Sequence, residues 1–101
     1  MRLPPAVSNL VNLQCLDASN NKIRTLPAEI GDMNSLRELY LNNNQVRVLP
    51  FEFGKLFKLG QLGLKGNPLT QDMMAIFMEP NGTQKLLIHL LDQLTSKKFV
   101  K

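Results

Sequence analysis

The chain has 101 residues, of which 44% are hydrophobic, and this length allows one small domain with a single core. The formal net charge is +4, and the basic residues are spread from Arg2 to Lys101 without forming a continuous track for a polyanion. No apolar run is long enough to span a membrane, Met1 is not followed by a secretory signal, and Cys15 has no second cysteine with which to pair. We therefore expect a protein of the cytoplasm or nucleus, with no membrane contact.

An internal repeat with a period of 23 residues organises the first two thirds of the chain. Each unit follows the pattern L-x-x-L-x-L-x-x-N-x-L, and the three aligned segments begin at Leu13, Leu36 and Leu59. The second half of the unit also repeats, as Leu3-Pro4, Leu26-Pro27 and Leu49-Pro50. Because a period of this length is typical of leucine-rich repeats, residues 1–69 predict an α/β solenoid with a parallel sheet on its concave face and an incomplete first repeat.

Each position of the repeat has a structural interpretation. Leu39 and Leu41 alternate with Tyr40, so the leucines should point into the solenoid and the tyrosine out of the sheet. The Leu-Pro half should form a short convex return whose apolar side chains are core residues, namely Ile30, Met33, Phe53 and Leu56. The repeated asparagine can satisfy backbone groups where the chain leaves the strand, which predicts a structural ladder of Asn21, Asn44 and Asn67. Ala18 stands where the pattern requires a leucine, which weakens the predicted N-terminal end.

Residues 70–95 lose the period and predict a helical C-terminal cap. Thr70 is a candidate N-cap for a first helix, and Thr83 for a second. One apolar stripe on the second helix is predicted from Leu86, Leu87, Leu90, Leu91 and Leu94. The methionines of the first helix also allow an adaptable partner groove. Residues 96–101 predict a basic tail.

Residues that could support catalysis or metal binding do not converge in the sequence. His89 is the only histidine and lies far from Cys15, and the acidic residues are dispersed. The three glycines at positions 60, 63 and 66 precede no helix that could bind a phosphate. We therefore expect no catalytic residues, no metal site and no cofactor, and interpret the chain as a binding module that is not an enzyme.

The outward positions of the predicted sheet form the candidate partner-binding surface. Tyr40 is central to it, since an amphipathic aromatic beside Arg37 is a side-chain combination enriched in interface hot spots. The predicted binding set comprises Arg37, Glu38, Tyr40, Asn42, Asn43, Gln61 and Lys65. The outward positions of the first repeat are Gln14, Cys15, Asp17, Ser19 and Asn20.

Two stretches of the repeats, residues 36–44 (LRELYLNNN) and 62–72 (LGLKGNPLTQD), resemble the repeat domain of the carbon catabolite repressor (CCR) type poly(A) deadenylase of the CCR-NOT complex. Residues 81–87 (NGTQKLL) and 91–94 (LDQL) are similar to the two-helix segment that follows the repeats in that family. The resemblance implies docking of the complex's second nuclease, a DEDD-type deadenylase, in mRNA deadenylation. The family's magnesium-dependent exonuclease domain is not matched by any residue of this sequence.

Two alternatives remain open at this point. Leu26-Pro27 and Leu49-Pro50 fit an intracellular signalling scaffold that binds small GTPases equally well. Direct RNA binding is suggested only by the mild positive charge and the terminal lysines, so we do not expect it. We expect the chain to be a monomer.

Overall fold

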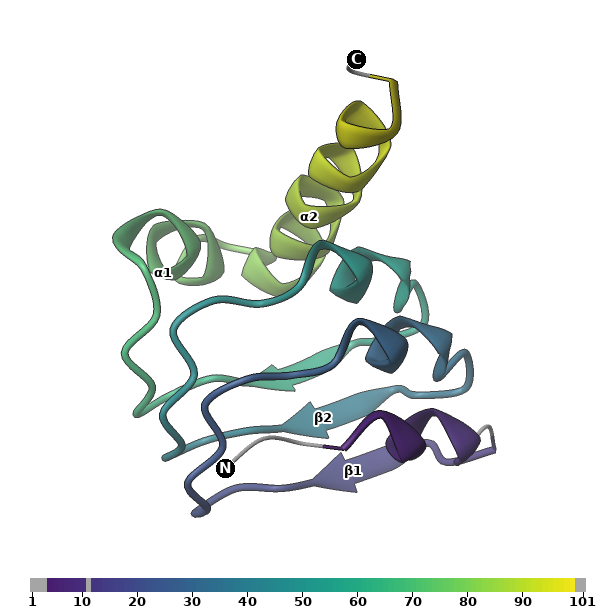
Figure 1. Ribbon diagram of the computed structural model, residues 1–101. Coiled ribbons are helices and arrows are strands. Elements are labelled where there is room, and N and C mark those ends of the chain that lie inside the picture. Colours follow the sequence, from purple (N-terminus) through teal and green to yellow (C-terminus); the bar gives the residue numbers. More distant parts are fainter. Residues whose placement is uncertain (1–3, 11, 100–101) are drawn as a thin grey trace.

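Three short parallel strands, one from each repeat, form the sheet of the protein (Figure 1). The computed structural model describes residues 4–10 and 12–99, with the side chains of the last helix described as far as Thr95. The strands are β1 (Cys15–Asp17), β2 (Glu38–Tyr40) and β3 (Gln61–Gly63), in the order β1-β2-β3. Leu16, Leu39 and Leu62 lie at equivalent positions in the register, which confirms the predicted solenoid.

Three 3-10 helices make the return on the side opposite the sheet, where a turn of helix was predicted (Figure 1). They are η1 (Pro5–Asn9), η2 (Ala28–Asp32) and η3 (Phe51–Lys55). Each begins directly after a proline in extended conformation, with ψ of 148°, 151° and 149°. Proline fixes φ and has no N–H to leave unpaired, so it can end the extended segment and start the return in every repeat.

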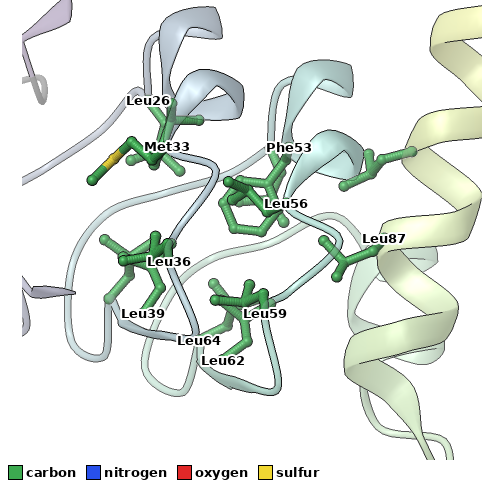
Figure 2. Packing of buried hydrophobic residues seen from close by; sticks show 14 of the residues in the cluster. Leu26, Met33, Leu36, Leu39, Phe53, Leu56, Leu59, Leu62, Leu64 and Leu87 are labelled. Carbon is green, nitrogen blue, oxygen red and sulfur yellow. The ribbon is translucent and has the colours of Figure 1, made fainter. Parts of the chain in front are cut away.

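The core fills the space between the sheet and the 3-10 helices. Figure 2 shows Phe53, Leu56, Leu59 and Leu64 packed together, with Leu87 pointing into this cluster from the last helix. The four predicted convex core residues are buried: Ile30, Met33 and Phe53 are 0% exposed and Leu56 is 1% exposed. Burial weakens toward the first repeat, where Ala18 is only half-buried while its equivalents Leu41 and Leu64 are fully buried.

The repeated asparagines bind the backbone of the preceding repeat. The side-chain oxygen of Asn67 accepts a hydrogen bond from the Val46 amide at 3.0 Å, and its NH2 group donates to the Leu41 carbonyl at 2.7 Å. Asn44 makes the equivalent bonds to the Ile23 amide (3.1 Å) and the Ala18 carbonyl (3.0 Å). Asn21 departs from the predicted internal ladder. It is exposed, and among the described residues its side chain bonds within its own turn, on the edge strand β1 of the described sheet.

The residue that precedes each of these asparagines has a conformational role of its own. Asn20, Asn43 and Gly66 all have positive φ, at 61°, 58° and 79°. Only glycine and, less readily, asparagine adopt this left-handed conformation at low cost. The turn after each strand therefore requires one of these two residues at this position of the 23-residue unit.

Two helices follow the third repeat, α1 (Gln71–Phe77) and α2 (Gly82–Phe99) (Figure 1). Thr70 is the N-cap residue of α1, but its side chain makes no capping hydrogen bond. The helix α2 continues to Phe99, so the boundary predicted between cap and tail at residue 95 is wrong: Lys97 and Lys98 lie within the helix. Lys101 lies outside the described residues. None of the described helices is long and apolar enough to cross a membrane.

The cap is formed mainly by α2, which packs against η3. Leu86, Leu87 and Leu90 are buried there, whereas Leu91 is 40% exposed, so the apolar stripe is narrower than predicted. Gly54 of η3 lies directly under α2: a Cβ at this position would be 2.5 Å from the Leu91 amide nitrogen. No residue of α1 is fully buried, although Met73, Ile76 and Phe77 pack against the edge of the core.

Candidate functional site

The outward side chains of the sheet stand in two rows across the three strands. The first row consists of Cys15, Glu38 and Gln61, and the second of Asp17, Tyr40 and Gly63. Because alternate residues of a strand point to the same face, both rows belong to the side of the sheet that faces away from the core. Tyr40 is the only large side chain in its row, with an aspartate on one side and a glycine on the other.

The Tyr40 side chain is hydrogen-bonded to Glu38, which lies two residues earlier in the same strand. Its hydroxyl donates a hydrogen bond of 2.7 Å to a carboxylate oxygen of Glu38, and both side chains are half-buried. This hydrogen bond, followed by partial loss of solvent and the nearby negative charges, raises the pKa of Tyr40 above its ordinary value. This hydrogen bond restrains the Tyr40 side chain before a partner binds, which reduces the side-chain entropy lost on binding.

Three further predicted residues are exposed around this pair. Arg37 precedes β2, Gln61 begins β3, and Lys65 follows it in the next loop. The carbonyl of Arg37 accepts hydrogen bonds from the amides of Gly60 (2.9 Å) and Gln61 (3.1 Å), which fixes the two strands to one another where these side chains emerge. Within residues 4–10 and 12–95 no carboxylate forms an ion pair with Arg37 or Lys65.

Asn42 and Asn43 have a different role in the structure. The side-chain oxygen of Asn42 accepts a hydrogen bond from the Lys65 amide at 3.0 Å, and the side chain covers Gly63 so closely that a Cβ there would be 2.7 Å from its nitrogen. The Asn43 NH2 group donates to the Asn20 side-chain oxygen at 3.0 Å. Both asparagines connect neighbouring loops through one polar atom of the side chain, and these bonds fix the shape of the surface.

The first repeat adds one carboxylate, that of Asp17, on the edge strand β1. The Ser19 amide donates a hydrogen bond of 3.0 Å to a carboxylate oxygen of Asp17. This bond and the one from the serine side chain lower the pKa of Asp17 below its ordinary value. The Ser19 hydroxyl in turn accepts a bond from the Asn42 amide at 3.2 Å, which links the first and second repeats.

Sequence reasoning missed two hollows elsewhere on the molecule. One, of about 260 Å³, lies between η3 and α2 and exposes Phe57, Ile88 and Leu91. The other, of about 530 Å³, lies among the loops that follow the strands and includes Arg24 and Arg47. The 23-residue spacing of these two arginines was visible in the sequence, because residues one period apart must stack in a solenoid.

Among the described residues, no group of three or more histidine, cysteine, aspartate or glutamate side chains could hold a metal ion. His89 is half-buried on α2, and Cys15 is exposed on β1.

Comparison with known proteins agrees with this architecture. The family profile described as Leucine Rich repeats (2 copies) matches residues 11–51. A solved leucine-rich-repeat protein of Leptospira interrogans is 42% identical, with a TM-score of 0.69 over 71% of this chain and 18% of that chain. The fold is that of a leucine-rich-repeat solenoid.

Short segments also match much larger curated proteins. The CCR4-NOT transcription complex subunit 6-like protein of Danio rerio is 57% identical over 30 residues, which are 30% of this chain and 5% of that protein. The subunit 6-like-A protein of Xenopus laevis is 58% identical over 31 residues, which are 31% of this chain and 6% of that protein. This chain therefore matches only a small part of each of these relatives.

Proposed function

We propose that this chain is a protein-interaction module that docks a partner nuclease, a DEDD-type deadenylase subunit, within cytoplasmic mRNA deadenylation. The observation that supports the proposal most strongly is the fixed Tyr40 side chain on the open face of the sheet, bonded to Glu38 at 2.7 Å. Tyrosine is one of the residues on which binding energy concentrates in protein interfaces. The local identity to CCR4-NOT subunit 6-like proteins supports the choice of complex.

The proposed surface is centred on Tyr40, Glu38, Arg37 and Gln61, with Lys65 at its margin. Asn42 and Asn43 stay in the proposed surface as the residues that shape it, since their side chains bind neighbouring loops. Adjacent strands lie about 4.8 Å apart, so three of them span only on the order of 10 Å. A standard interface buries about 800 Å² on each partner, so the partner must also contact loops beyond the strands.

A matched pair of variants tests the position of this surface. The first, Arg37→Ala/Tyr40→Ala/Gln61→Ala, removes a cation, an aromatic and an amide from the strand face. The control, Lys58→Ala/Phe57→Ala/Gln84→Ala, removes the same three kinds of side chain near η3 and α2, where all three are exposed. Binding of each to the purified deadenylase subunit is measured by calorimetry, and thermal unfolding checks the fold.

We expect the strand-face variant to bind at least about 30-fold more weakly, which corresponds to the loss of one interface hot spot. The control should bind like the unmodified chain. Equal binding by both variants would show that the strand face is not the docking surface. If the unmodified chain binds no deadenylase but retains a small GTPase, the signalling-scaffold alternative replaces the proposal.

A further inference from the structure

The hollow on the loop side of the solenoid combines two arginines with an apolar floor. It lies outside the strands, among the segments that lead from each asparagine turn toward the next Leu-Pro step. It is lined by Arg24, Thr25, Gln45, Arg47, Val48 and Pro68. We refer to these six residues as the arginine cleft.

The two arginines occupy equivalent positions in consecutive repeats. Because neighbouring coils of the solenoid stack about 4.8 Å apart, their side chains emerge next to one another. The Arg24 Nε atom donates a hydrogen bond of 3.0 Å to the side-chain oxygen of Gln45, which holds one edge of its guanidinium group and leaves the other donors for a ligand. Arg47 is fixed through its backbone, since its carbonyl accepts a bond from the Thr70 amide at 3.0 Å.

No carboxylate of the described residues forms an ion pair with Arg24 or Arg47. In the part of the chain whose side chains are described, the only ion pair joins Lys85 and Glu79 on the exposed surface at the helical end. Arginine presents its donors in a planar arrangement that matches carboxylates and phosphates in pairs. Two such groups side by side therefore favour an anionic ligand.

The other side chains that line the arginine cleft favour one class of anionic ligand over another. Val48 is 52% exposed, and together with Pro68 it provides an apolar surface beside the guanidinium groups. None of the six lining residues is aromatic, whereas binding of single-stranded nucleic acid depends strongly on stacking of bases on aromatic side chains. An extended peptide that alternates carboxylates with aliphatic side chains satisfies both parts of the cleft.

We propose that the arginine cleft is a second docking site, which binds an acidic peptide segment with interspersed aliphatic residues from a partner protein. Carboxylates of the segment contact Arg24 and Arg47, and an aliphatic side chain rests on Val48 and Pro68. The site is separate from the strand face, so it stands whether or not a nuclease binds there.

The test uses fluorescence anisotropy with a labelled eight-residue peptide of alternating glutamate and leucine. The same peptide with glutamine in place of glutamate measures the apolar contribution alone, and a labelled poly(A) oligonucleotide measures nucleic-acid binding. Arg24→Gln/Arg47→Gln removes two charges from the cleft. The control, Lys55→Gln/Lys58→Gln, removes two charges from exposed positions in and beside η3, so both variants have the same net charge.

We expect the acidic peptide to bind about tenfold more weakly to Arg24→Gln/Arg47→Gln, and to bind the control variant like the unmodified chain. The variant Arg24→Lys/Arg47→Lys should give an intermediate affinity, since it keeps the charge but loses the planar donors.

Three results would overturn the proposal. The first is equal binding of the acidic peptide to Arg24→Gln/Arg47→Gln and to Lys55→Gln/Lys58→Gln, which would mean that only net charge matters. The second is binding of the glutamine-containing peptide as tightly as the acidic one. The third is the absence of peptide binding. Arginine-dependent binding of poly(A) without binding of the acidic peptide would assign the cleft to nucleic acid instead. Thermal unfolding of each variant verifies that the fold is intact.

Discussion

The two ends of the solenoid are built from the same 23-residue unit but differ in how much of that unit is buried. At the C-terminal end, α2 covers η3, and Phe53 and Leu64 are completely inaccessible to solvent. At the N-terminal end, Val7 retains 8% exposure, and Ala18 replaces the leucine found in the other two repeats. Burial in this fold therefore depends on what is stacked against a repeat as well as on the repeat's own residues.

The asparagines show the same contrast. Asn44 and Asn67 each bind an amide and a carbonyl of the preceding repeat from a buried position. Asn21 is exposed, and its bonds within the described residues are to Ala18 and Ser19. We therefore expect a repeated asparagine to have a large effect on stability only where the coil before it supplies backbone groups. Matched pairs of substitutions test this expectation.

Phe53→Ala should lower the free energy of unfolding by about 3–5 kcal/mol, because it leaves a cavity where the third coil meets α2. The matched substitution Phe57→Ala should change it by less than about 0.5 kcal/mol, because Phe57 is 74% exposed. Urea denaturation followed by circular dichroism measures both. Similar losses for the two phenylalanines would contradict the burial of Phe53 between the third repeat and α2.

Asn44→Ala should cost up to about 3 kcal/mol, because it leaves the buried Ile23 amide without its acceptor. Asn21→Ala should cost less than about 0.5 kcal/mol, since water can replace the bonds of an exposed side chain. Urea denaturation followed by circular dichroism measures both losses of stability. An equally large loss for Asn21→Ala would contradict the idea that the asparagine stabilises the fold through the backbone of the preceding coil.

Gly54→Ala should destabilise the protein by about 1–3 kcal/mol, because its Cβ would meet the backbone of α2 at Leu91 and at Leu87 (2.7 Å to the carbonyl oxygen). Gly60→Ala is the control: no atom lies within 4 Å of its Cβ position, so the change should be near neutral. Stability is compared by thermal unfolding. A neutral result at Gly54 would show that α2 does not pack firmly on η3.

Glu38→Gln should lower the pKa of Tyr40 toward its ordinary value of 10.0, because it removes the negative charge of the carboxylate that accepts the hydrogen bond from the Tyr40 hydroxyl. Asp17→Asn, on the open edge strand, should lower this pKa less, because Asp17 acts only through space. Tyr40 is the single tyrosine and the chain has no tryptophan, so absorbance of the tyrosinate reports this site alone.

The raised pKa of Tyr40 also determines how the stability of the fold should change with pH. The folded state holds the Tyr40 proton more tightly than the unfolded chain, so the interaction with Glu38 favours folding below about pH 10 and is lost as the pH rises through the raised pKa. An equal shift of the pKa in the Glu38 and Asp17 variants would contradict the importance of the hydrogen bond.

The sequence predicted the parts of the structure that follow from the period alone. The positions of the strands, the inward leucines and the convex core residues Ile30 and Phe53 all follow from alternation and repetition. The exposure of Asn21 was not predicted, because it depends on which coil lies next to the residue. The continuation of α2 to Phe99 was not predicted either, because the apolar stripe that indicated this helix in the sequence ends at Leu94.

For the candidate site, the sequence identified the outward residues but not their mutual bonds. It placed Glu38 and Tyr40 on one face, since they are two positions apart on a strand, yet their hydrogen bond depends on side-chain rotamers. It placed Asn42 in the predicted binding set but gave no sign of the bond that its side-chain oxygen accepts from the Lys65 amide, one repeat further along the chain.

The most direct test of the strand-face proposal is to map the contact surface by NMR. The ¹⁵N-labelled chain is titrated with the unlabelled DEDD-type deadenylase subunit, and the change of each amide signal is followed. We expect the largest changes in amide chemical shift at Glu38, Tyr40 and Gln61 in β2 and β3, and little change in the amide signals of η3. Changes confined to η3 and α2, or no change at saturating partner, would contradict it.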